Sequence, residues 1–330
     1  VYGVAVSFSM LFNDQLACFT AVNNWWDRRR GEQGGYVQAL GALGGVVFPP
    51  IITWLFLNFS WKSALIIMAV LLMLITAIPQ MIFMRDHPSE LGLEMDGGPA
   101  EGKPAKPGKA RRVYQGYKSP VDWEIKDAVR CPQLWIVGLA WGSTVFGYCA
   151  VQYFGMTHLI MNGFADITAA SAVSIMSGAL LVGSLILSPL TDRMNPKIAL
   201  VLIGVVASVG CVLFDVAARS GSMPLMVLSM IVAGAPNGPI ICAVMNTLVS
   251  YFGAKNYAGI QPYCNVLLTL IGAASSAVCG WALTQFGSLS NAYYVAAVFG
   301  VVISVAVLLF LKPPKVSEKM LAKYQAKAAQ

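Results

Sequence analysis

Nine stretches of mainly apolar residues follow one another along the chain, each long enough for a membrane helix and almost without charge. A helix of about 20 residues crosses a hydrocarbon core of about 30 Å, and lipid offers backbone groups no other partner. Strand-like alternation of apolar and polar residues is absent from all nine stretches. The pattern therefore predicts an all-α polytopic membrane protein with nine transmembrane helices, at residues 1–26, 33–59, 61–84, 133–161, 167–190, 197–217, 223–252, 257–286 and 291–311.

A polar segment at residues 85–120 separates the first three stretches from the other six. It contains GGPAEGKPAKPGKARR, a composition rich in Pro, Gly and Lys that cannot bury a core and is typical of a linker. We therefore expect four parts. They are a partial N-terminal lobe at 1–84, a cytoplasmic linker with a short pre-helix at 85–132, a complete six-helix lobe at 133–311 and a basic tail at 312–330.

Composition and charge agree with a membrane protein. Apolar residues make up 57% of the chain and charged residues 11%, which is far from the soluble average. If the C-terminus is cytoplasmic, 20 of the 22 Lys and Arg residues lie on the cytoplasmic side, and only Lys62 and Arg219 lie outside. The net charge of +7 is then a topology signal, so a nucleic-acid partner is not needed. We expect a monomer in the plasma (cytoplasmic) membrane.

Four short motifs carry a resemblance to a known family. They are WDRRRG at 26–31, RDHPSELGL at 85–93, SPLTDRMNPK at 188–197 and YFGAKN at 251–256. With this spacing the chain resembles helices 4 to 12 of a transporter of the major facilitator superfamily. The linker motif is similar to the branch of monocarboxylate and oxalate/formate carriers. The resemblance implies two lobes that rock about a central site, and it implies that the counterparts of helices 1 to 3 are absent from this sequence.

The resemblance also implies which helices line the solute path. The counterparts of helices 4, 7 and 10 carry polar residues within the membrane, among them Asp14, Gln152, His158, Asn237 and Asn246. Away from their first residues, the counterparts of helices 6, 9 and 12 are nearly bare of such groups and hold Gln80 and, toward a helix end, Asp215. Polar groups are costly in lipid, so this sorting is expected of path-lining and lipid-facing helices.

Several residues are candidates for the solute path. Trp141, Tyr148 and Gln152 stand at i, i+7 and i+11, so they share one helix face that offers aromatic rings with polar tips. Packing between helices alone would explain the same stripe. The segment 234–239 interrupts the tenth helix near its middle, either as part of a binding site or as a packed kink. We add Asn237, Asn246 and Asn265 to the predicted path.

Asp14 is the candidate for proton coupling or solute orientation. It lies 12 residues before Trp26, which places it about 18 Å from the cytoplasmic edge, near the middle of the membrane. A carboxylate there needs a partner, water or a proton. An ion pair with a basic residue on another helix is the alternative to a role in coupling.

Two groups of residues are candidates for conformational change. Gly41 and Gly45 form a G-x-x-x-G step that lets helices approach closely, either as a rocking surface between lobes or as packing within one lobe. The resemblance implies that Asp192, next to Arg193 in a cytoplasmic turn, faces the N-terminal end of the helix that begins near Gln33. A solvated loop pair is the alternative for these two residues. Arg28, Arg29 and Arg30 mark the same side of the membrane. Asn195 replaces the usual glycine of that motif, and we expect it to tolerate left-handed geometry.

The sequence is most consistent with a secondary active transporter of a small organic solute, in particular a small carboxylate, with protons as a further partner. A transporter-like sensor is an alternative. A membrane enzyme would lack a recognisable nucleophile, base or metal site, and we expect neither cofactor nor metal. No Lys or Arg lies mid-membrane after residue 133, so a neutral or zwitterionic solute stays open.

Overall fold

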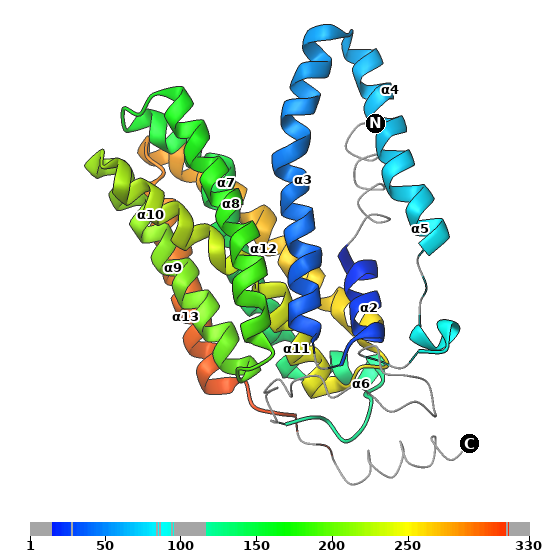
Figure 1. Ribbon diagram of the computed structural model, residues 1–330. Helices are drawn as coiled ribbons and strands as arrows, with labels where there is room; N and C mark the ends of the chain where they lie inside the picture. Colours follow the sequence, from blue (N-terminus) through cyan, green and yellow to red (C-terminus); the bar gives the residue numbers. More distant parts are fainter. Residues whose placement is uncertain are drawn as a thin grey trace.

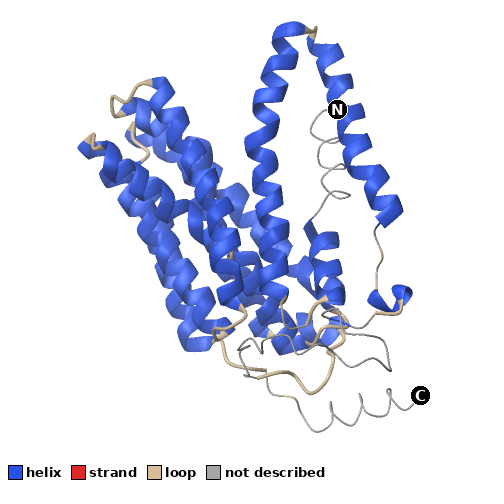
Figure 2. Ribbon diagram, viewed as in Figure 1, coloured by secondary structure: helices blue, strands red, loops and turns tan. Residues whose placement is uncertain are grey.

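The computed structural model describes residues 15–27, 29–83, 85, 87–93, 95, 117–314 and 316. These residues form helices joined by short turns and contain no strand (Figure 2). The all-α fold predicted from the apolar stretches is confirmed. The described cysteines are free thiols, and the described residues contain no group of three or more His, Cys, Asp or Glu that could hold a metal ion.

The C-terminal lobe contains six helices that are long and apolar enough to cross a membrane. Their bounds follow the predicted stretches closely, because each stretch ends where charged or turn-forming residues begin. Five are single elements and one is interrupted. They are α7 (Pro132–Met161), α8 (Asp166–Thr191), α9 (Pro196–Ser220), α10 (Met223–Gly234) with η4 (Ala235–Asn237) and α11 (Ile240–Phe252), α12 (Tyr257–Phe286) and α13 (Ser290–Phe310).

The N-terminal part is described from residue 15 onward. It holds α2 (Gln15–Trp25) and α3 (Arg30–Asn58), then a helical rod made of α4 (Trp61–Leu72), the π turn η1 (Met73–Ala77) and α5 (Ile78–Phe83). The second and third predicted spans are therefore helical. Residues 1–14 of the first predicted span lie outside the described residues, and the count of nine spans stays a prediction.

The helices define two ends of the molecule. One end carries α6 (Ile125–Val129) together with the last linker residues 117–124, and we call it the linker end. The α3–α4 turn and the α7–α8 turn lie at the opposite end, which we call the far end (Figure 1). α3 and α8 approach each other toward the linker end and diverge toward the far end (Figure 1).

The start of α9 shows how the SPLTDRMNPK motif ends one helix and begins the next. The Asn195 side chain caps α9 by accepting a hydrogen bond of 3.0 Å from the Lys197 backbone N–H, and Pro196 occupies the first helical position. Asn195 has φ −60° and ψ 124°. Its backbone is therefore not left-handed here, and the tolerance expected of Asn at this position is not needed, because its amide serves as an N-cap.

The predicted break in the tenth helix is present as the 3-10 turn η4 between α10 and α11. It packs closely on α8. A Cβ added to Gly183 would meet the Ala235 carbonyl, and one added to Gly238 would meet the Ser184 backbone. Glycines on both sides therefore allow backbone contact, and the break is a packed kink in this conformation.

Buried apolar side chains form two clusters in the C-terminal lobe. The cluster toward the linker end also takes in Phe19 and Val22 of α2, so it joins the two parts of the molecule. The cluster toward the far end contains Phe146, Phe214 and Tyr293 and stays within the C-terminal lobe. Apolar burial across the two parts is therefore concentrated at the linker end among the described residues.

Candidate functional site

The carboxylate of Asp192 bridges α8 to the first turn of α3. Its Oδ1 accepts a hydrogen bond of 2.7 Å from the Gly31 backbone N–H, and its Oδ2 accepts one of 3.1 Å from Glu32 N–H. The first N–H groups of a helix have no partner within the helix, and the helix dipole favours an anion there. This is the contact that the sequence analysis expected, with α3 beginning at Arg30.

Asn246 of α11 supports the same carboxylate. Its Nδ2 donates to Asp192 Oδ1 at 3.0 Å and lies 3.3 Å from Thr191 Oγ1. The Thr191 hydroxyl in turn donates to the Ser188 carbonyl at 2.7 Å. Asn246 was predicted to line the solute path, yet in this conformation its amide holds the contact between α8 and α3.

Burial raises the pKa of the Asp192 carboxyl, and the hydrogen bonds from Asn246, Gly31 and Glu32 oppose that rise. An ionised carboxylate can accept all three hydrogen bonds, whereas a protonated one must use an oxygen as a donor. The contact is therefore favoured where the carboxyl is ionised.

Two glycines of α3 make the close approach to α8. A Cβ added to Gly31 would lie 2.5 Å from Asp192 Oδ1, and one added to Gly35 would lie 2.5 Å from the Ser184 carbonyl. Gly41 is exposed, and a Cβ there would meet nothing within 4 Å. Gly45 lies in α3, but its surroundings are outside the described part. The predicted gating role of Gly41 and Gly45 stays a prediction, and Gly31 and Gly35 make the contact in this structure.

The arginine cluster lies at the linker end. Arg30 is buried and its Nη1 lies 3.2 Å from Asp27 Oδ1, while the other Asp27 oxygen lies 3.5 Å from Lys118 Nζ. Arg29 and Arg193 are exposed on the two sides of the Asp192 contact. Arg28 is outside the described residues. The ion pairs join α3 to the end of the linker.

A second contact across the two parts lies beside the first. The Asn23 amide of α2 donates a hydrogen bond of 3.1 Å to the Ala254 carbonyl, in the turn between α11 and α12. A Cβ added to Gly34 would lie 2.9 Å from Cys242 Sγ of α11. We use the term linker-end gate for Asn23, Gly31, Gly35, Asp192 and Asn246.

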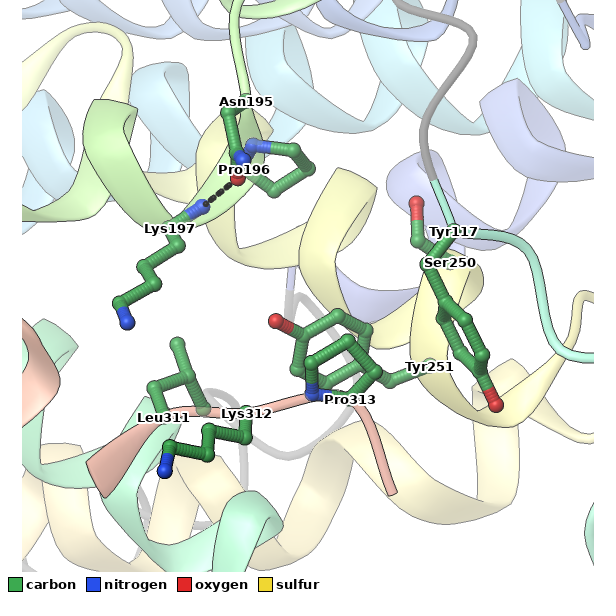
Figure 3. Close-up of a pocket in the computed structure, with 9 residues that line it drawn as sticks. All are labelled: Tyr117, Asn195, Pro196, Lys197, Ser250, Tyr251, Leu311, Lys312 and Pro313. Carbon is green, nitrogen blue, oxygen red and sulfur yellow. Dashed lines mark hydrogen bonds between the residues drawn. The ribbon is translucent and has the colours of Figure 1, made fainter. Parts of the chain in front are cut away.

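The linker itself is fastened across the end of the C-terminal lobe. The Trp123 backbone N–H donates to the Phe252 carbonyl at 2.9 Å, and the two rings meet edge to face. A hollow of about 130 Å³ lies nearby, with Lys197, Tyr251 and Lys312 among its lining residues (Figure 3). Tyr117, which also lines it, donates a hydrogen bond of 3.1 Å to the Pro314 carbonyl. The linker and the segment after α13 therefore meet at the linker end.

The predicted stripe on α7 divides between the two buried clusters. Trp141 is 5% exposed and belongs to the cluster toward the linker end. Tyr148 is half-buried against the other cluster. Gln152 is half-buried, and its Oε1 is buried without a hydrogen-bond partner among the described residues. Gln152 is thus the member of the stripe with an unused polar atom.

The other predicted path residues lie at different depths. Asn237 is buried in η4, where its amide donates to the Ala233 carbonyl at 3.0 Å and its Oδ1 accepts no hydrogen bond from described residues. Asn265 is half-buried on α12. Asp14 is outside the described residues. Roles of these residues in a solute path stay predictions.

His158 does not line a path between the two parts. It is 2% exposed, and its Nε2 lies 3.1 Å from Asp215 Oδ1 of α9. The sequence analysis assigned His158 to a path-lining helix and Asp215 to a lipid-facing helix. That assignment was wrong for His158, because the two side chains form a pair within one lobe.

Sequence reasoning missed three members of the gate. Gly31 and Gly35 have the same four-residue spacing as Gly41 and Gly45, so the spacing itself could have pointed to them. Asn23 could not be singled out from the sequence, because Asn is common near the ends of helices.

Comparisons with known proteins agree with this architecture. The family model described as Major Facilitator Superfamily matches residues 15–261 and, in a second match, residues 163–328. The protein named Hexuronate transporter from Bacillus subtilis (strain 168) is 23% identical in an alignment over 310 residues, and the match covers 88% of this chain and 68% of that protein. Because the family match spans most of a chain built from apolar helices, this multi-pass membrane protein belongs to the major facilitator superfamily and is a solute transporter, not an enzyme.

Proposed function

We propose that the protein carries a small organic acid across the membrane by alternating access, and that the linker-end gate closes one side. The observation that carries this proposal is the pair of hydrogen bonds from α3 to Asp192. They join two helices from different parts of the chain at a helix end, where a rocking motion can make or break them without disturbing either helix.

The exposure of α3 supports a structure that is closed at one end only. Gly31 and Gly35 are buried against α8, whereas Leu40 is 68% exposed and Val47 is 45% exposed. The buried face of α3 against α8 thus lies near the linker end. In alternating access, the opposite state would open the linker end and bring the far-end part of α3 toward the C-terminal lobe.

The proposed solute class is a small carboxylate, and a sugar acid is our first choice. The relative's name supports a hexuronate, which carries one carboxylate and several hydroxyl groups. Gln152 and Asn237 offer buried carbonyl oxygens that have no hydrogen-bond partner in the described part of the chain, and such oxygens accept hydrogen bonds from hydroxyl groups. Leaving them unpaired costs about 1–3 kcal/mol each.

A neutral polyhydroxylated solute is the second candidate. The four Lys and Arg residues from 133 to 311 are Arg193, Lys197, Arg219 and Lys255, and all lie at or near helix ends. The C-terminal lobe therefore has no fixed positive charge at mid-membrane for a carboxylate. Any such charge would come from residues before 133.

We further propose that the protein lies in the plasma membrane with its linker end facing the cytoplasm, and that it works as a monomer. Of the described Lys and Arg residues, only Lys62 and Arg219 are at the far end. An excess of Lys and Arg marks the cytoplasmic side. The C-terminus is then cytoplasmic, as expected from the sequence.

Uptake into proteoliposomes tests the proposal. The protein expressed from its own gene is reconstituted, and entry of labelled glucuronate is compared with entry of labelled glucose and of a labelled amino acid. We expect glucuronate uptake that unlabelled glucuronate inhibits. Preferential glucose uptake would favour the neutral solute, and saturable binding without entry would identify a sensor.

A further inference from the structure

Three ionisable side chains meet inside the C-terminal lobe, near the far end. Asp215 of α9 is fully buried. Its Oδ1 lies 3.1 Å from His158 Nε2 of α7, and its Oδ2 lies 3.0 Å from Arg219 Nε, one turn further along α9. The carboxylate therefore sits between an imidazole and a guanidinium.

The surroundings of His158 are aromatic. Its ring lies 5.6 Å from the Phe214 ring and 4.9 Å from the Tyr293 ring, measured between centroids. Among the described residues, the titratable and charged groups around it are Asp215 and Arg219 from α9 and Tyr293 and Tyr294 from α13. The thiols of Cys211 and Cys279 lie near Tyr293. Asp215 is the one acid in this set and Arg219 the one permanent cation.

A buried carboxylate in a membrane helix is costly unless it is paired, and Arg219 already balances its charge. The imidazole is therefore not needed for neutrality. Imidazole is the side chain that ordinarily gains or loses a proton between pH 5 and 8. A proton on His158 would place a positive charge beside the Asp215 carboxylate, so that both partners of the contact would be charged and the contact would be stronger.

The cluster is close to one membrane face. His158 lies three residues before the end of α7 at Met161, and Arg219 lies one residue before the end of α9 at Ser220. The Arg219 side chain is 54% exposed, whereas Asp215 and His158 are almost inaccessible. The far end is therefore the side from which solvent comes nearest to the pair, at the Arg219 side chain.

We propose that His158 is a proton-binding site of the C-terminal lobe, loaded from the far face, with Asp215 and Arg219 as its fixed charges. Proton binding tightens the attachment of α7 to α9. Because α7 also carries Tyr148 and Gln152, occupancy of the site makes solute transport depend on the pH at the far face. This last consequence rests on the proposed transport function, whereas proton binding itself does not.

The chain offers a direct measurement, because His87 and His158 are its only histidines. In the His87→Gln variant, a protein labelled with ¹³C and ¹⁵N at histidine gives the signal of His158 alone. We expect that signal to titrate reversibly between pH 5 and 8 in nanodiscs. A signal that keeps the shift of one protonation state over this range overturns the proposal.

Two further variants, each made in the His87→Gln protein, should change the protonated fraction of His158 in opposite directions. Asp215→Asn removes the negative partner, so the ratio of protonated to neutral imidazole should fall roughly tenfold or more at a given pH. Arg219→Gln removes a positive neighbour, so that ratio should rise. Lys62→Gln is the matched control, because it removes one positive charge from the same face at a distance from His158. Shifts of the same sign in both variants, or an equal shift in the control, contradict the proposal.

The variant Arg219→Gln keeps the measurement interpretable if Asp215→Asn does not fold, because Arg219 is half exposed. Uptake of glucuronate is measured in parallel at several outer pH values, with His158→Gln compared with His87→Gln. Loss of the pH dependence only in His158→Gln supports the link to transport. If His158 titrates but the protein takes up no glucuronate, the proposed transport function is refuted and the proton site is retained. If the pH dependence of uptake in His158→Gln equals that in His87→Gln, the proton site does not control transport.

Discussion

The Asp192 carboxylate lies over the first turn of α3, where its Oδ1 is 2.7 Å from the backbone nitrogen of Gly31. One charged side chain thus holds the ends of two helices that are 160 residues apart in the sequence and belong to different parts of the molecule. The contact is small, polar and located at helix ends. It can therefore break without unfolding either helix, which is what a gate requires.

Asp192→Ala should open the linker end. Three hydrogen bonds to a charged group are lost, two of them from α3. Each is worth about 1.5–3 kcal/mol, so the closed state should lose roughly tenfold or more in population. Cys242 reports this opening, because it is fully buried beside Gly34. In a variant with Cys242 as its only cysteine, labelling by an impermeant maleimide from the linker face should become several-fold faster.

The matched control is Asp166→Ala, which removes a carboxylate from the other end of α8, where Asp166 is exposed. Labelling of Cys242 should stay unchanged in that variant. Equal labelling rates in the Asp192 variant and the unmodified protein would show that the carboxylate does not hold the gate.

Gly35→Leu should also open the linker end, because its side chain would occupy the space of the Ser184 carbonyl and the Ser188 side chain. At Gly41 the first added atom, Cβ, would meet nothing within 4 Å, and the position is exposed. If the predicted gating role of Gly41 is correct, the larger side chain of Gly41→Leu should oppose the opposite conformation and slow Cys242 labelling. Equal effects of the two substitutions would refute a role for close packing at Gly35.

Asn246→Ala should weaken the gate through Asp192. It removes one hydrogen bond to the carboxylate, so Cys242 labelling should rise less than in Asp192→Ala. A double-mutant cycle checks the shared mechanism, because the double variant should label no faster than Asp192→Ala alone. Additive effects would mean that Asn246 acts elsewhere, for example on the solute.

Tyr148→Phe and Gln152→Ala test the predicted path on α7. Gln152 has an unused buried oxygen, so its removal should weaken apparent solute affinity, by roughly tenfold for a lost hydrogen bond to solute. Tyr148→Phe tests the hydroxyl alone. Gln133→Ala, at the linker end of the same helix, is the control for expression and folding. Unaltered uptake kinetics in both path variants would mean that this face serves packing.

Asp14→Asn tests the predicted coupling group. We expect loss of proton-driven accumulation with exchange of solute across the membrane retained, because exchange needs no net proton movement. Uptake against a gradient and counterflow are measured on the same vesicles. If accumulation and its pH dependence both survive the substitution, Asp14 has no part in coupling.

The sequence predicted the six helices of the C-terminal lobe because lipid forces every polar backbone group into a helix, so that apolar stretches and helices have the same ends. It also predicted the Asp192 contact, through the resemblance of SPLTDRMNPK to a family motif. It did not identify Gly31 and Gly35 as the close contact, because glycine spacing shows that a helix can approach another but not which turn does so.

The pairing of His158 with Asp215 was beyond sequence reasoning for a related reason. The two residues lie on helices that are not consecutive, and the rotation of each helix about its axis decides whether a polar group faces the path or a neighbour. The aromatic rings of Phe214 and Tyr293 fix that rotation here. Nothing in the spacing of polar residues along α7 indicated it.

The distance between Arg29 and Arg193 reports whether the linker end opens and closes. Both side chains are exposed, and they flank the Asp192 contact on its two sides. Spin labels are attached to Arg29→Cys and Arg193→Cys in a protein without other cysteines, and their separation is measured by pulsed electron paramagnetic resonance. We expect a short distance without solute, and a second, longer distance that gains population with glucuronate or with Asp192→Ala. One unchanged distance under all these conditions would contradict the proposed gate.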